Sequence, residues 1–138
     1  MCQIFVSADP ELYSHRSRSL RLHGAVTCIR LENLFWQVLE EIAARDELSL
    51  SQLITRLYDE IIETRGDVEN FSSFLRVSCL RYLALQADGG IPGDASIPIR
   101  SLDAGEVLSR DRFMRHGQHG TGPEAASPPL RHHQAGRA

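Results

Sequence analysis

The passage "GAVTCIRLENLFWQVLEEIAARDELSLSQLI", residues 24–54, passes without a break from a strand pattern into a helical one. Residues 26–31 alternate between two faces, and apolar residues recur at helical spacing after Leu31. A single strand cannot satisfy its own backbone N–H and C=O groups, so a lone strand ahead of two helices needs a partner strand. The simplest partner is the same strand of a second copy, paired antiparallel about a two-fold axis. The sequence therefore favours a homodimer.

The residues just before this passage also have extended character. Leu20 and Leu22 share one face of an extended chain, with polar neighbours on the other. Gly24 interrupts the alternation, so we expect a bulge or bend there between two extended pieces. In the second piece we expect Thr27, Ile29 and Leu31 to face the helices.

Two amphipathic helices follow the strand. The first begins after Leu31 and ends near residues 46–48, and its pattern predicts that Arg45 faces away from the core. The second opens with Ser49 as N-cap and Gln52 three residues later, which is the spacing of a capping box, and it closes at Gly66.

A third helix is predicted over residues 70–86, and it is apolar almost all round. Such a helix must be covered, which again favours a homodimer. From residue 88 on, Gly, Pro, Ser and His crowd the chain and apolar residues are scattered singly, which is typical of disorder. We therefore expect an N-terminal segment (1–15), a domain with a third helix (16–86) and a disordered tail (87–138).

Charge is distributed unevenly along the chain. The formal net charge is −3, yet no acidic residue lies between Glu11 and Glu32. Ten acidic residues follow from Glu32 to Glu69. The basic residues of the acid-free stretch are arginines, because the chain contains no lysine. A basic N-terminal part thus precedes an acidic helical body, an arrangement that permits contact with a nucleic acid despite the negative total.

The order strand, helix, short turn, helix in "VTCIRLENLFWQVLEEIAARDELSLSQLITRLYDEI" resembles the ribbon-helix-helix (MetJ/Arc) superfamily of dimeric DNA-binding proteins. The segments "SLRLHGAVTCIRLE", "FWQVLEEIAARDELSLSQLI" and "NFSSFLRVSCLRYL" resemble, in this order, a small bacterial subgroup with an added third helix. The resemblance covers about residues 16–86. It implies a mainly α fold whose strands pair across a homodimer, and a transcriptional regulator that inserts this ribbon into the major groove of duplex DNA.

The resemblance also implies which side chains read bases. They are the outward residues of the strand, and Thr27 joins them if the register differs by one residue. A guanidinium can pair bidentately with guanine O6 and N7, which makes Arg30 the strongest of these candidates. The candidate base-reading residues are Val26, Thr27, Cys28 and Arg30.

A second contact implied by the resemblance is a DNA phosphate held by the amino-terminal turn of the second helix. Free N–H groups and the helix dipole attract an anion there. The arginines upstream of the strand could follow the DNA backbone. The candidate phosphate-binding residues are Ser49, Leu50, Ser51, Arg16, Arg18 and Arg21.

Simpler interpretations stand beside these roles. The Ser49–Gln52 pair is also an ordinary helix cap, the arginines upstream of the strand could form a flexible arm, and Cys28 could be a small packing residue. The low-hydrophobicity tail or the third helix could instead bind a protein partner, as in an antitoxin-like or adaptor module.

The remaining sequence features point away from other classes of protein. We find no nucleophile beside a base, no phosphate loop and no HExxH, so we expect neither an enzyme nor a cofactor. The histidines of the tail, at 116, 119, 132 and 133, have no fixed ligand spacing, so we expect no metal site. Three widely separated cysteines and the lack of a membrane span or signal peptide indicate a cytoplasmic protein.

Overall fold

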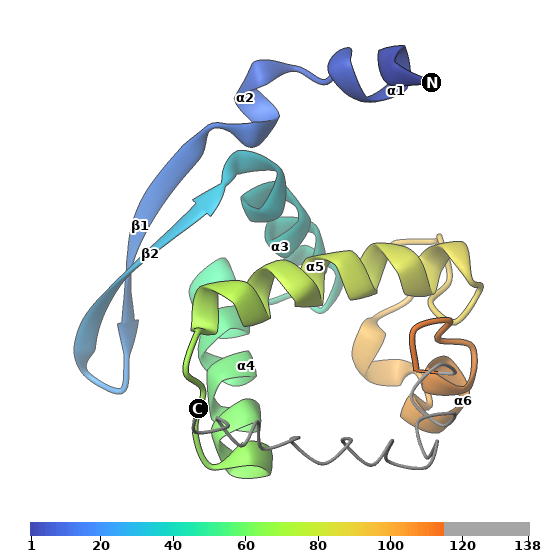
Figure 1. Cartoon of the computed structure of the whole chain (residues 1–138). Helices are drawn as coiled ribbons and strands as arrows, with labels where there is room; N and C mark the ends of the chain where they lie inside the picture. Colours follow the sequence, from blue (N-terminus) through green and yellow to red (C-terminus); the bar gives the residue numbers. More distant parts are fainter. Residues whose placement is uncertain (115–138) are drawn as a thin grey trace, which may run out of the picture.

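The computed structural model of the chain describes residues 1–114 (Figure 1). A two-stranded hairpin lies along one side of a group of helices, and α1 projects away from this body (Figure 1). The elements in chain order are α1 (Cys2–Val6), α2 (Pro10–Tyr13), β1 (His15–Leu22), β2 (Ala25–Glu32), α3 (Asn33–Arg45), α4 (Leu50–Arg65), α5 (Phe71–Ala87), the 3-10 helix η1 (Ile99–Ser101) and α6 (Ala104–Ser109). Within this part of the chain, no helix is long and apolar enough to cross a membrane.

The strand β2 is not alone in its chain, so the premise of a lone strand is wrong. It pairs antiparallel with β1 over its whole length, from His15 opposite Glu32 to Leu22 opposite Ala25. The bend predicted at Gly24 is confirmed as the turn of this hairpin. His23 and Gly24 both have positive φ, 50° and 80°, as the tight two-residue turns of β-hairpins require. The chain therefore supplies its own ribbon, and the strand pairing gives no argument for a second copy.

The faces of the hairpin follow the alternation predicted for β2. Ile29 and Leu31 are buried and Thr27 is half-buried on the side of the helices, which confirms the predicted inward set. Leu20 and Leu22 of β1 are buried on the same side. The apolar residues of both strands thus close over the helices, and this burial fixes the register because a slip of one residue would expose all of them.

Helices α3 and α4 begin and end where the sequence predicts. Ser49 caps α4 with the complete capping box, and Gly66 ends it with a φ of 79°. The prediction for Arg45 is wrong, because its side chain is buried beneath the segment that follows α5. Its guanidinium forms no salt bridge to a described residue and donates instead to backbone carbonyls and to the Tyr82 hydroxyl.

The segment from residue 88 to 114 is ordered, so the prediction of a disordered tail from residue 87 is wrong over this range. Arg45 donates from Nε to the carbonyl of Ile97 (2.7 Å) and from Nη2 to those of Pro92 (2.6 Å) and Asp94 (3.0 Å). Ile91 is buried in the core. The buried Arg45 guanidinium thus binds several carbonyls of this irregular segment. Single apolar residues such as Ile91 anchor the segment in the core. The part of the predicted tail from residue 115 to 138, with its four histidines, lies outside the described residues.

This segment changes how α5 is covered. The apolar residues Ile99, Leu102 and Val107 pack against the core near Leu85 at the carboxyl end of α5. The cap at Asn70 is confirmed, since its side chain accepts a hydrogen bond from the N–H of Ser73 (3.1 Å). Part of the cover expected from a second copy therefore comes from the chain itself.

Candidate nucleic-acid interface

One face of the hairpin points away from the helices, and we call it the outward face. Its cross-strand pairs are Ser17 with Arg30, Ser19 with Cys28, and Arg21 with Val26, and all six side chains are exposed. Side chains of a strand alternate between faces, so these residues form one continuous surface. The outward face consists of Ser17, Ser19, Arg21, Val26, Cys28 and Arg30.

Both arginines of the outward face lack an internal partner. Neither Arg21 nor Arg30 forms a salt bridge or a side-chain hydrogen bond with any other residue among 1–114. The next pair on this side of the hairpin is His15 with Glu32, and the Glu32 carboxylate is already engaged by Arg76 and His15. The predicted base-reading residue Arg30 thus has an unpaired guanidinium, and so does Arg21 at the other end of the same face.

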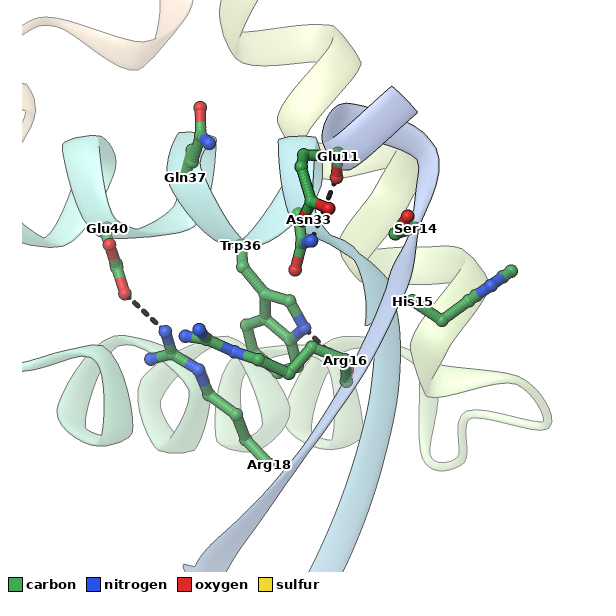
Figure 2. A pocket seen from close by; sticks show the side chains of 9 residues that line it. All are labelled: Glu11, Ser14, His15, Arg16, Arg18, Asn33, Trp36, Gln37 and Glu40. Atoms are coloured by element: carbon green, nitrogen blue, oxygen red, sulfur yellow. Dashed lines mark hydrogen bonds and ion pairs between the residues drawn. The ribbon is translucent and has the colours of Figure 1, made fainter. Parts of the chain in front are cut away.

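Arg16 and Arg18 lie on the opposite side of β1, towards α3 (Figure 2). The Arg18 guanidinium pairs with Glu40 (2.7 Å) and lies 5.1 Å from the centre of the Trp36 ring. The Trp36 indole N–H donates to the carbonyl of Arg16 (2.8 Å). These arginines line a cavity of about 530 Å³ that also contains the carboxylates of Glu11 and Glu40. The structure therefore separates Arg16 and Arg18 from Arg21, although the sequence suggested one cluster.

Thr27 does not share the outward face. It is half-buried and lies opposite Leu20, on the side that packs against the helices. Val26, by contrast, is 68% exposed. Of the four candidate base-reading residues, Val26, Cys28 and Arg30 therefore lie together, and Thr27 lies behind them.

The amino-terminal turn of α4 presents two free backbone donors. The Ser49 N–H donates to the Gln52 side chain (2.9 Å), and the Gln52 N–H donates to Ser49 Oγ (3.1 Å). Within the described residues, the N–H groups of Leu50 and Ser51 have no acceptor. The ordinary capping role of Ser49 is thus present, and it leaves two amides and the helix dipole for an anion.

A shallow groove runs along α4 from this amino-terminal turn. It is lined by residues of α4 from Ser51 to Glu60, with Leu48 at its edge. At its far end, Asp59 accepts a hydrogen bond from the His23 imidazole in the hairpin turn. Ser51 and Asp59 are eight residues apart, which is about 12 Å along a helix axis. The hairpin tip is therefore fixed to the same helix whose beginning offers the free amides.

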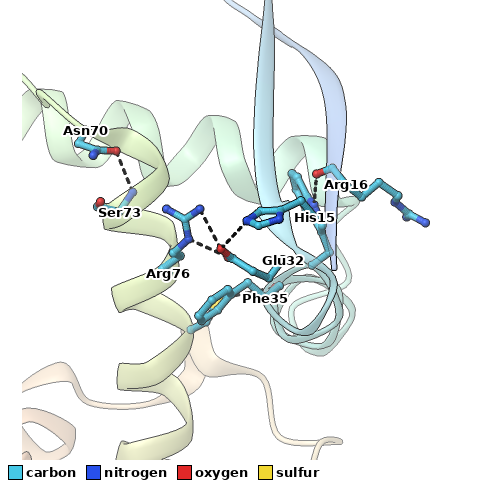
Figure 3. A network of polar contacts seen from close by, with 9 residues as sticks. His15, Arg16, Glu32, Phe35, Asn70, Ser73 and Arg76 are labelled. Carbon is cyan, nitrogen blue, oxygen red and sulfur yellow. Dashed lines mark hydrogen bonds and ion pairs between the residues drawn. The ribbon is translucent and has the colours of Figure 1, made fainter. Parts of the chain in front are cut away.

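The other end of the hairpin is fixed by Glu32, on which the side chains of Arg76 and His15 converge (Figure 3). Arg76 of α5 donates to both carboxylate oxygens, at 2.8 and 3.2 Å, and His15 Nε2 lies 3.2 Å from one of them. The hydrogen bonds from Arg76 lower the pKa of the Glu32 carboxyl, although partial burial opposes this. An ionised Glu32 thus joins both strands to α5.

The three cysteines are free thiols in different environments. Cys28 and Cys2 are exposed, and Cys79 is buried. Burial raises the pKa of the Cys79 thiol to about 12, so this group remains protonated at neutral pH. Among residues 1–114, no three His, Cys, Asp or Glu side chains are grouped as metal ligands.

Sequence reasoning missed Ser17 and Ser19 as members of the outward face. Part of the signal was present in "SLRL", residues 19–22, where polar and apolar positions alternate up to the two residues His23 and Gly24. Two extended runs separated by two turn residues are typical of a hairpin. The arginines at 16, 18 and 21 were instead expected to follow the DNA backbone or to form a flexible arm.

Comparison with known proteins supports this architecture. The family profile described as "ribbon-helix-helix domain" matches residues 15–83, from the first residue of β1 into α5. The chain belongs to this family, whose members generally bind DNA and regulate transcription and are not enzymes. No curated protein matches the chain. The solved structure of an uncharacterized protein from Bordetella pertussis Tohama I is 53% identical; the match covers 92% of this chain and 95% of that one, with a TM-score of 0.76.

Proposed function

We propose that this protein is a homodimeric transcriptional regulator of a bacterial cytoplasm that binds specific sequences of duplex DNA through its hairpin. The observation that carries the proposal is the exposed outward face with its unpaired guanidinium of Arg30. A two-stranded ribbon has the width that the DNA major groove admits. In this orientation Val26, Cys28 and Arg30 meet the base edges.

The three side chains offer different contacts to DNA. Arg30 pairs with O6 and N7 of a guanine, the commonest specific contact in the major groove. Val26 offers an apolar surface to a thymine methyl group. The thiol of Cys28 is a weak hydrogen-bond donor, so it contributes shape more than polarity. Thr27 faces the helices, so it is not assigned a base contact.

Phosphate contacts orient the hairpin in the groove. We assign one to the free amides of Leu50 and Ser51, with Ser49 holding the turn in place. The exposed Arg16 reaches a phosphate without losing an internal partner, whereas Arg18 must first release Glu40. Each phosphate contact steepens the dependence of log affinity on log salt by about 0.9.

The proposed dimer rests on α5 and on the family, since members typically bind DNA as dimers. Val77, Leu80 and Leu83 of α5 are 53%, 56% and 41% exposed, although the segment after α5 covers other parts of the helix. Three exposed apolar side chains on one helix are a surface that a second copy would bury. The alternative is a different protein partner on the same surface, and co-purification of such a partner would favour an adaptor or antitoxin-like role.

The test begins with selection of binding sites from random duplexes by the purified full-length protein. We expect a consensus sequence, and we expect Arg30→Ala to lower affinity for it by between about fivefold and 150-fold at constant salt. Fluorescence anisotropy measures this affinity. Arg30 is exposed and unpaired, so the variant should unfold at the same temperature as the wild type.

Arg65→Ala is the matched control, since it removes the same charge from an exposed position at the carboxyl end of α4. It should bind the consensus nearly as the wild type does. The proposal fails if the wild type selects no sequence at low salt. It also fails if both variants lose the same affinity on every duplex, which would indicate general electrostatic attraction only.

A further inference from the structure

We infer that β1 supplies half of the base-reading surface, with Arg21 contacting a base edge rather than a phosphate. One chain then carries a complete two-stranded reading face, in which Ser17, Ser19 and Arg21 act together with the outward residues of β2. This inference rests on the proposed DNA-binding function and extends it to a second strand.

The register places these residues directly beside those of β2. Arg21 lies opposite Val26, and Ser17 lies opposite Arg30. Neighbours across an antiparallel pair have Cβ atoms about 4.5–5.5 Å apart, so a groove that receives one strand receives both. A DNA surface that contacts Arg30 on the outward face therefore also faces β1.

The two free guanidiniums occupy opposite ends and opposite strands of the outward face. From the Ser17–Arg30 pair to the Arg21–Val26 pair the ribbon advances four residues. Four residues span about 13 Å at ~3.3 Å per residue. This length corresponds to about four base-pair steps of ~3.4 Å. The geometry therefore predicts two guanine contacts about four base pairs apart within the site bound by one chain.

The residues between the two arginines suit close approach to DNA. Ser19 and Cys28 face each other in the middle of the face and are both small. A serine hydroxyl donates and accepts, so Ser17 and Ser19 can contact several base edges. A small centre flanked by two long cationic side chains lets the backbone of the ribbon lie deep in the groove.

The turn holds this arrangement within one chain. His23 and Gly24 adopt the positive φ angles of a tight hairpin turn, and His23 is hydrogen-bonded to Asp59 of α4. Arg21 is two residues before this turn, so its position depends on the anchored tip. A flexible arginine arm that follows phosphates would have no such anchor.

The test measures preference at each base pair of the selected consensus for Arg21→Ala, with Arg16→Ala as the matched control. Both arginines are exposed on β1, and they lie on opposite faces of the hairpin. For Arg21→Ala we expect discrimination to fall by between about fivefold and 150-fold at one base pair, about four steps from the pair affected by Arg30→Ala. Arg16→Ala should leave every base preference unchanged and lower affinity equally on all duplexes.

The outcomes separate this inference from the proposed function. If Arg30→Ala loses preference at one base pair and Arg21→Ala only weakens binding uniformly with a smaller salt slope, Arg21 is a phosphate contact. The inference is then overturned and the proposed function stands. If the wild type selects no sequence, both fail. Thermal unfolding of both variants at the wild-type temperature verifies that the hairpin remains folded.

Discussion

Arg18 and Arg21 lie three residues apart on β1, yet their guanidiniums have opposite environments. Arg18 faces α3, where Glu40 and the Trp36 ring engage it. Arg21 faces outward and contacts no acidic residue among 1–114. The difference arises from the two-residue period of a strand, which sends neighbouring positions to opposite sides of the hairpin.

This contrast extends over the molecule. On the side of the helices, Arg45 and Arg76 hold backbone carbonyls or carboxylates of the chain itself. On the outward face, the guanidiniums of Arg21 and Arg30 form no salt bridge or side-chain hydrogen bond within residues 1–114. A net charge of −3 conceals this division because it counts both groups alike. The number of arginines therefore says little about a nucleic-acid partner. Whether an arginine is already paired with an acidic residue of the chain is more informative.

The comparison predicts that removing an internal arginine damages stability, with the largest effect at Arg45. Arg45→Ala deprives the carbonyls of Pro92, Asp94 and Ile97 of their donor and leaves a void beneath the segment. We expect the free energy of unfolding to fall by about 3–5 kcal/mol, because several hydrogen bonds from a charged group are lost together. Urea denaturation followed by circular dichroism measures this loss.

Arg100→Ala is the control for Arg45. Arg100 donates to the carbonyl of Asp46 in the same region, but its side chain is 53% exposed. Its loss should cost less than about 1 kcal/mol. Equal effects of the two substitutions would contradict the division between buried and exposed arginines.

The contrast between the two faces of the hairpin requires that β1 and β2 are joined by the turn at Gly24. The variant Gly24→Ala tests this turn. Gly24 has a φ of 80°, and a left-handed conformation costs a residue with a Cβ about 1–2 kcal/mol. No atom lies within 4 Å of the position of the added Cβ, so the expected loss of stability comes from the backbone alone. Thermal unfolding of the variant measures it.

Gly93→Ala provides the reference for this change. It also meets no atom within 4 Å, and its φ lies outside the left-handed region, so we expect a neutral or slightly stabilising effect. If Gly24→Ala is equally neutral, the chain does not turn at this point, and β1 cannot present the outward face described above.

Local signals in the sequence predicted β2 and the three long helices α3, α4 and α5 correctly. The caps at Ser49, Gly66 and Asn70 lie at the expected helix ends, because capping depends on residues within a single turn. The inward residues of β2 follow from its alternation. The in-chain partner of β2 was missed because β1 begins with polar residues that resemble a basic arm. Strand pairing is a contact between distant positions, and a pattern within one strand does not specify it.

The segment after α5 shows a different limit. Its order depends on Arg45, which is 47 and 52 residues before the carbonyls of Pro92 and Ile97 that it binds. Composition alone indicates disorder there, since apolar residues are sparse. At the candidate interface, Val26, Cys28 and Arg30 were placed together from the sequence. The separation of Arg16 and Arg18 from Arg21 was not, because it depends on the strand that was missed.

The smallest expected effect concerns an internal arginine that depends on an ionised carboxylate. Arg76 lowers the pKa of Glu32 in the folded chain, so the pair stabilises the fold fully above the unfolded pKa, near 4.5. This contribution is lost as the pH falls through the lowered pKa of the folded state. Glu32→Gln should cost about 1 kcal/mol at neutral pH, and its difference from the wild type should shrink on acidification. Urea midpoints at neutral pH and below about pH 4 measure this, since the unfolded carboxyl is then mostly protonated.

Glu63→Gln, at an exposed position of α4 with no salt bridge to a described residue, should change neither value. A constant difference at both pH values would mean that Glu32 acts through packing and not through its charge.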